Sequence, residues 1–182
     1  MDNLGPQPLW GWIRELAPRA GLETFRLQAY TFNNGDAGIP RRFVLNLALA
    51  HGATLKHFMV GESYMTLSDV ECLCSKFPGL ETLVCSVSSP DVDSIIHAIA
   101  GAKHLQTLTL QVKWIPGDAR NTGTSISVED AKRMMLRSKD SKLRTISVGH
   151  YQYTGKWVLH EEEDEKLQFV VSADKAGEGW HT

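Results

Sequence analysis

The sequence predicts an α/β fold: a short right-handed α/β solenoid of about five parallel strands, with helices on its convex face and a C-terminal β extension. Two observations predict it. The strand pattern leucine-x-x-apolar-x-apolar recurs along the chain, and an apolar helical pattern precedes each copy. Helices that alternate with short strands give parallel strands with right-handed connections. Such units cannot bury their apolar faces alone, so they are expected to stack.

The two clearest copies of the strand pattern are consecutive. Leu80 leads one copy, which ends at Cys85, and Leu105 leads the other, which ends at Leu110. The spacing from Leu55 to Leu80 equals that from Leu80 to Leu105, so the pattern has a period. The leading leucines of all copies are Leu22, Leu55, Leu80, Leu105 and Leu143. We expect these leucines to stack in one column.

Hydroxyl and proline residues mark the expected helix starts. Ser68 and Glu71 form a capping-box pattern, and Ser89 and Ser127 are the expected N-caps of the next two helices. Pro40 suits the first turn of the helix before the second strand.

The chain is expected to form a single repeat domain over residues 1–182. A helix cap at 9–20 precedes the repeats at 21–149. A C-terminal β-hairpin or strand cap at 150–172 is expected to close the exposed sheet edge, before a mobile tail at 173–182.

Within the C-terminal cap, the pattern predicts three strands. Those at 151–153 and 156–159 are expected to be joined by a tight turn at Thr154 and Gly155, and the last is expected at 167–171. The acidic run from Glu161 to Glu165 is interpreted as a solvated loop. The alternatives are a site for a basic partner or a cation, and an internal contact with the basic stretch from Lys132 to Arg144.

Composition narrows the class of protein. Hydrophobic residues make up 42% and charged residues 22% of the chain, which is typical of a globular domain. The net charge of -2 does not favour nucleic acid or an anionic membrane. No apolar run approaches the roughly 18 residues that cross a bilayer, and no secretory signal pattern is seen. We expect a cytoplasmic or nuclear protein with Cys72, Cys74 and Cys85 as buried free thiols.

Motifs that carry chemistry are missing from the sequence. It shows no glycine-rich phosphate loop or nucleophile elbow, and its histidines lack zinc-ligand spacing. The expectation is therefore no enzyme, with no catalytic residue, cofactor or metal. The alternative is an enzyme or a small-ligand-binding α/β domain that uses the loops at the carboxyl ends of the strands.

Alternating strand positions are expected to line an open sheet face. They form two columns: Thr24, His57, Thr82, Thr107, Thr145; and Arg26, Met59, Val84, Thr109, Ser147. Two long insertions, at 32–38 and 114–123, leave the carboxyl ends of strands. The hypothetical contacts for a protein partner are Arg26, His57, Met59, Thr82, Thr107, Phe32, Trp114 and Arg120. The alternative for the threonines is simply favourable sheet chemistry. Self-association through the sheet edges is a further hypothesis.

The L-x-x-L-x-L strands with intervening helices resemble leucine-rich repeats. With the run from Leu143 to Val171, residues 9–171 resemble the C-terminal repeats of fungal F-box-associated leucine-rich-repeat proteins. The resemblance implies a non-catalytic protein–protein interaction scaffold, and a substrate-recognition module of a ubiquitin ligase. The family's usual asparagine position holds Tyr30, Ser63, Ser88, Lys113 and Tyr151. No F-box is seen before Trp10, so the ligase role is expected to need a segment outside this sequence.

Overall fold

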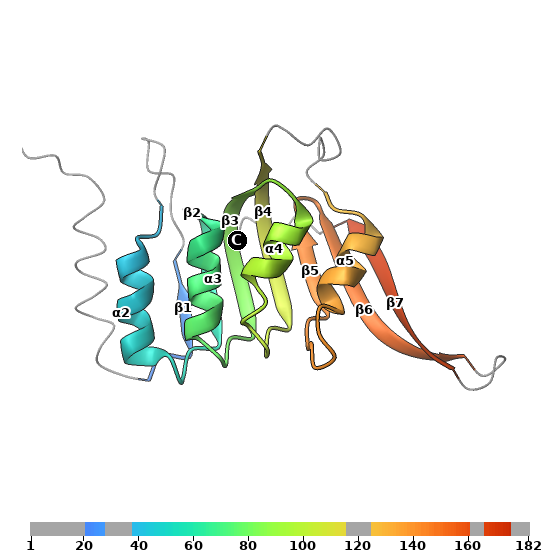
Figure 1. Cartoon of the computed structure of the whole chain (residues 1–182), viewed down its shortest axis with the longest axis horizontal. Coiled ribbons are helices and arrows are strands. Elements are labelled where there is room, and N and C mark those ends of the chain that lie inside the picture. Colours follow the sequence, from blue (N-terminus) through green and yellow to red (C-terminus); the bar gives the residue numbers. More distant parts are fainter. Residues whose placement is uncertain (1–20, 28–37, 116–124, 161–165, 176–182) are drawn as a thin grey trace, which may run out of the picture.

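The computed structural model describes residues 21–27, 38–115, 125–160 and 166–175. These residues form one seven-stranded sheet whose strands follow the chain order from β1 to β7 (Figure 1). The helices are α2 (Arg41–His51), α3 (Leu67–Lys76), α4 (Val92–Ala98) and α5 (Val128–Met135). The strands are β1 (Thr24–Arg26), β2 (His57–Met65), β3 (Thr82–Ser89), β4 (Thr107–Trp114), β5 (Thr145–Val148), β6 (Tyr151–His160) and β7 (Lys166–Lys175).

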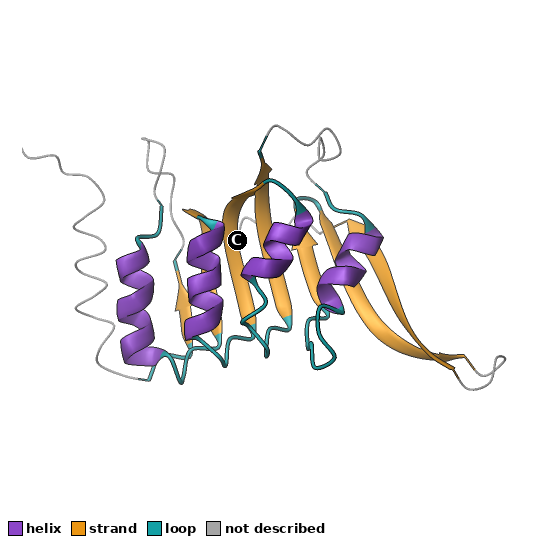
Figure 2. Cartoon of the chain, in the orientation of Figure 1, coloured by secondary structure: helices purple, strands orange, loops and turns teal. Residues whose placement is uncertain are grey.

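The described helices all lie on one face of the sheet (Figure 2). Strands β1 to β5 are parallel, and β6 and β7 are antiparallel to their neighbours. The predicted α/β class is therefore confirmed, as are the five parallel strands within the described residues. None of the described helices is long and apolar enough to span a membrane.

The leading leucines stack at the amino ends of the strands. Leu55, Leu80, Leu105 and Leu143 are fully buried, and Leu22 is half-buried. The residue after each of the last four leucines donates its N–H to the backbone carbonyl of the residue at the same place in the preceding repeat. These bonds are Lys56 to Glu23 (2.8 Å), Glu81 to Lys56 (2.7 Å), Gln106 to Glu81 (2.8 Å) and Arg144 to Gln106 (3.0 Å). The leucine column is thus built by a continuous backbone ladder, and the apolar core lies between it and the helices.

Two of the predicted helix starts are wrong by two residues. The N-cap of α3 is Thr66, whose Oγ1 accepts from the Asp69 N–H at 3.1 Å, rather than Ser68. The N-cap of α4 is Asp91, which accepts from Ser94, rather than Ser89. In both places two residues able to cap lie two positions apart, so the residue types alone do not decide where the helix begins. Ser127 caps α5 as predicted, and Pro40 is the residue before α2.

The C-terminal cap departs from the expected hairpin. No turn occurs at Thr154 and Gly155, because β6 runs through both to His160, and β7 continues past residue 172 to Lys175. The reason is packing: a Cβ on Gly155 would collide with Phe169 on β7 and Met135 on α5. The glycine marks a close approach inside a strand, where turn and close approach look alike in sequence.

Candidate binding face of the sheet

The candidate site is the open face, which we define as the side of the sheet away from α2 to α5. Its most regular feature is a row of register partners across the strands, which we call the hydroxyl row. The row consists of Thr24, His57, Thr82, Thr107, Thr145, Thr154 and Ser172. The repeat predicts its first five members, and the antiparallel strands extend it to β7.

His57 interrupts the hydroxyl row and bonds to its neighbour. Its Nδ1 lies 3.0 Å from the Thr82 Oγ1. If the threonine donates, the imidazole proton sits on Nε2 and is available as a donor on this face. A histidine beside a hydroxyl resembles an activated nucleophile, but that chemistry needs a third group to orient the imidazole. Among the described residues no carboxylate is bonded to His57, so the pair is better suited to hydrogen bonding with a partner.

The next row carries apolar side chains. Met59 on β2 is the register partner of Arg26 on one side and of Val84 on the other. Met59 and Val84 are half-buried, and Arg26 is exposed. The row continues through Thr109 and Ser147, which are only 8% and 3% exposed. The accessible part of this row is therefore its amino-terminal end, on β1 to β3.

A bulge in β2 shifts its register with β3 toward the carboxyl ends of the two strands, on the open face. Met59 pairs with Val84, but Tyr64 pairs with Ser86, so β2 contains extra residues around Gly61. Gly61 has φ +51°, a left-handed conformation that favours glycine. The bulge brings the Tyr64 hydroxyl to accept from the Ser88 N–H at 3.1 Å, and the Ser86 hydroxyl contacts the Gly61 carbonyl at the same distance. Sequence reasoning missed this bulge, for which Gly61 inside a strand pattern was the available signal.

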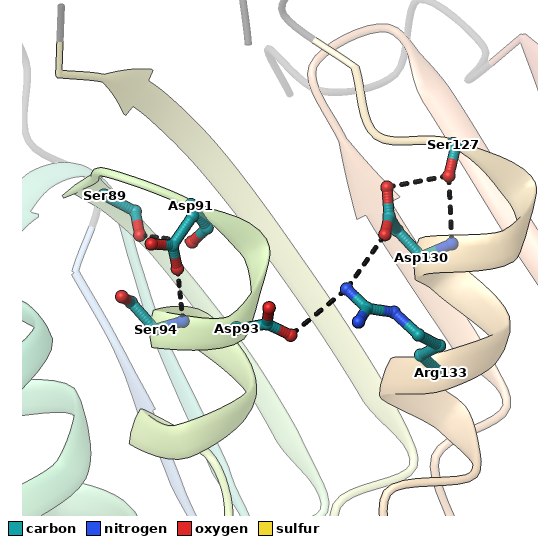
Figure 3. A network of polar contacts seen from close by, with 7 residues as sticks. All are labelled: Ser89, Asp91, Asp93, Ser94, Ser127, Asp130 and Arg133. Carbon is teal, nitrogen blue, oxygen red and sulfur yellow. Dashed lines mark hydrogen bonds and ion pairs between the residues drawn. The ribbon is translucent and has the colours of Figure 1, made fainter. Parts of the chain in front are cut away.

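Polar residues at the carboxyl ends of the strands are used to hold the helices (Figure 3). Asp91 Oδ1 accepts from the Ser94 N–H at 2.7 Å, and Ser127 Oγ accepts from the Asp130 N–H at 3.0 Å. Arg133 on α5 bridges Asp130, at 3.0 Å, and Asp93 on α4, at 3.1 Å. Arg133 and Asp93 are exposed and Asp130 is half-buried at the surface, so each ion pair contributes about 0–1 kcal/mol. Within the described residues, the polar side chains at this edge cap α4 and α5 and join the two helices to each other.

The predicted contact residues fall into three groups. His57, Met59, Thr82 and Thr107 lie on the open face, and Arg26 lies at its β1 end. Trp114 instead packs against the core from the helix side of β4, next to Ser89 of β3. Its buried indole N–H has no acceptor among the described residues. Phe32 and Arg120 lie outside the described residues.

The thiols are buried away from the open face. Burial raises the pKa of Cys74 to about 12, an effect that Arg137 partly offsets. Burial and, to a smaller degree, Cys74 raise the pKa of Cys85. A thiol in this environment is a poor nucleophile and a poor metal ligand, because both roles need the thiolate. In the described part of the chain, no group of three His, Cys, Asp or Glu residues is placed to hold a metal ion.

The two rows nearest the amino ends of β1 to β5 thus offer hydroxyls, the His57 imidazole and a small apolar patch. Comparisons with protein-family models, curated proteins and solved structures found no match.

Proposed function

We propose that this chain is a short solenoid of the leucine-rich-repeat type that acts as a non-catalytic scaffold and binds another protein on its open face. One observation supports this proposal above all. Parallel sheets are normally covered on both faces, but the described helices here cover only one (Figure 2). The other face carries aligned, half-buried side chains, among them His57, Met59, Thr82 and Val84.

The chemistry of the open face suits a polypeptide partner. Met59 and Val84 supply an apolar anchor, and the hydroxyl row beside them can donate and accept hydrogen bonds. Substrate recognition for a ubiquitin ligase is the narrower form of this proposal, and it rests on the resemblance to F-box-associated repeats. The location that the sequence leads us to expect, the cytoplasm or the nucleus, is part of this proposal.

Affinity capture from an extract of the source organism tests the proposal. The double variant Met59→Glu, Val84→Glu places two carboxylates in the apolar patch, and we expect it to lose captured partner about tenfold or more, since buried unpaired charge is costly. Leu49→Glu, on the exposed surface of α2, is the control and should capture normally. Normal capture by the double variant, with an unchanged circular dichroism spectrum and melting temperature, would rule out this face.

A small-ligand binder at the carboxyl ends of the strands is the second candidate. The observation that favours it is the buried Trp114 indole N–H, which lacks an acceptor among the described residues and lies where β4 ends. A thermal-shift screen against metabolites distinguishes the two. A concentration-dependent rise in melting temperature that Trp114→Phe removes would favour the ligand site.

A further inference from the structure

The C-terminal strands form an arm that extends beyond the parallel sheet. Strand β5 pairs with β6 only from Tyr151 to Thr154, whereas β6 and β7 stay paired out to His160 and Lys166. Figure 1 shows this arm projecting past the rest of the sheet at the lower right. A two-stranded ribbon is marginally stable alone in water, so an arm of this length is expected to pack against something.

The arm exposes large apolar side chains on the helix side of the sheet. Trp157, Leu159 and Leu167 are 48%, 51% and 56% exposed, and the register places Leu159 opposite Leu167. Next to them, Phe169 is buried against the ring of Trp157 at a centroid distance of 5.0 Å. Trp157, Leu159 and Leu167, which we call the exposed strip, therefore continue the apolar core outward and become exposed to solvent beyond α5.

Strand β7 also leaves a long backbone edge without a described neighbour. The pairing of β7 with β6 shows no register shift from Lys166 to Lys175, and the strand contains no proline. Proteins usually protect a free edge with short strands, bulges, proline or inward charges. The opposite edge, β1, follows this rule because it is only 3 residues long. Charged residues stand only at the two ends of β7, so its edge from Leu167 to Ala173 is unprotected and suited to pairing with another strand.

The direction of the backbone groups on this edge can be worked out. Gly155 on β6 donates its N–H to the carbonyl of Arg144, just before β5, so the odd-numbered residues of β6 bond to β5 and the even-numbered residues bond to β7. The register partners of these even-numbered residues are themselves even-numbered. The even-numbered residues of β7 then bond to β6. The residues whose N–H and C=O groups point away from the sheet are Leu167, Phe169, Val171 and Ala173.

We propose that two copies of this chain form a dimer by antiparallel pairing of β7 with β7 around a two-fold axis at Val170. The axis must set outward-facing residues opposite each other, which permits centres at 169, 170 and 171. The centre at Val170 pairs Phe169 with Val171 and Leu167 with Ala173, all apolar. It also sets Gln168 opposite Ser172, which are both polar.

The neighbouring registers are less favourable. Each of them sets a polar or charged residue opposite an apolar one. A centre at Phe169 sets Gln168 opposite Val170, and a centre at Val171 sets Lys175 opposite Leu167. The chosen register also brings the exposed strip toward the second copy's α5. Leu167 comes beside Ala173 of that copy, whose register partner Tyr153 donates its hydroxyl to the Ile126 carbonyl just before α5.

Disulfide trapping in the full chain tests the register. Two Val170→Cys chains place identical thiols in a non-hydrogen-bonded pair, where the Cα atoms lie about 4.5 Å apart and a disulfide can form. In a dimer of two Gln168→Cys chains, the two introduced thiols lie about 13 Å apart, too far to form a disulfide. The same holds for a dimer of two Ser172→Cys chains. We expect Val170→Cys to cross-link at least about tenfold more than either. A mixture of the other two variants should cross-link as well. Equal yields from all three variants, or none from Val170→Cys, would overturn the register.

Sedimentation equilibrium tests the dimer itself. We expect the unmodified chain to dimerise in the micromolar range. Val170→Lys should raise the dimer dissociation constant about tenfold or more, since it sets two lysines opposite each other. Val158→Lys makes the same change on the same face of β6, one strand away from the edge, and should leave the dimer intact. A monomer at all concentrations would overturn the proposal. If Val170→Lys fails to fold, the cysteine variants decide.

Discussion

His57 Nδ1 lies 3.0 Å from the Thr82 hydroxyl, across two parallel strands of the open face. Among the described residues, this contact is the one hydrogen bond between two side chains of the hydroxyl row, so it singles out Thr82 among otherwise similar threonines. Thr82→Val keeps the shape of the side chain but removes the partner of a half-buried imidazole nitrogen. We expect a loss of about 1 kcal/mol in the free energy of unfolding, measured with urea.

Thr107→Val is the matched control for this change. Thr107 is the register partner of Thr82 on β4, is half-buried in the same way, and has no described hydrogen bond from its hydroxyl. Its replacement should change the free energy of unfolding by less than about 0.5 kcal/mol. Equal losses in the two variants would contradict the role assigned to the His57 contact.

Gly61 should resist substitution because of its backbone conformation. Its φ of +51° costs a residue with a side chain about 1–2 kcal/mol, so Gly61→Ala should lower the free energy of unfolding by that amount. Gly79→Ala is the control, because a Cβ there would lie 4.0 Å from the Leu55 carbonyl oxygen, an ordinary contact. A stable Gly61→Ala variant would argue against the bulge in β2.

Gly155 should resist substitution for a different reason, the close approach of Phe169 and Met135. Gly155→Ala is expected to lower the free energy of unfolding by about 1–3 kcal/mol, as overpacking does. Phe169→Leu in the same chain should recover part of this loss, because the smaller side chain makes room. Calorimetry of the two single variants and the double variant measures the coupling. Strictly additive effects would mean that the two side chains do not meet.

The buried thiols predict a loss of stability at alkaline pH. A cysteine in the unfolded chain loses its proton near pH 8.5, whereas folding raises the pKa of Cys74 to about 12. Between these values the unfolded state binds fewer protons, so the free energy of unfolding falls as pH rises, by about 1 kcal/mol per pH unit for this thiol. Urea titrations from pH 8 to pH 10.5 should show a shallower decline in Cys74→Ala. Parallel declines would contradict the assignment.

Much of the fold could be predicted because the same helix-and-strand pattern occurs in consecutive repeats. The pattern led by Leu80 recurs at Leu105, so strand positions, leucine column and sheet faces follow from one period. The rows of the open face followed for the same reason, since every strand starts in the same register. The antiparallel end of the sheet lies outside the repeat, and there the sequence pattern predicts a turn at Gly155 where the structure has a continuous strand.

Other features depend on contacts that no local pattern records. Thr66 and Ser68 are both residue types that cap well, and in the structure β2 ends at Met65 and Thr66 takes the N-cap position. Trp114 stands beside an insertion in the sequence, but the alternation of β4 turns it toward the helices. The bulge at Gly61 changes the register of one strand against another, which a single chain pattern does not show.

Site-specific photo-cross-linking tests the proposed open face most directly. A photoreactive amino acid at position 84, on the open face, is compared with the same group at position 49, on the exposed surface of α2. In extracts of the source organism, we expect one reproducible protein adduct from position 84 that excess unmodified chain removes, and no such adduct from position 49. No competed adduct from position 84, or the same adduct from both positions, would contradict it.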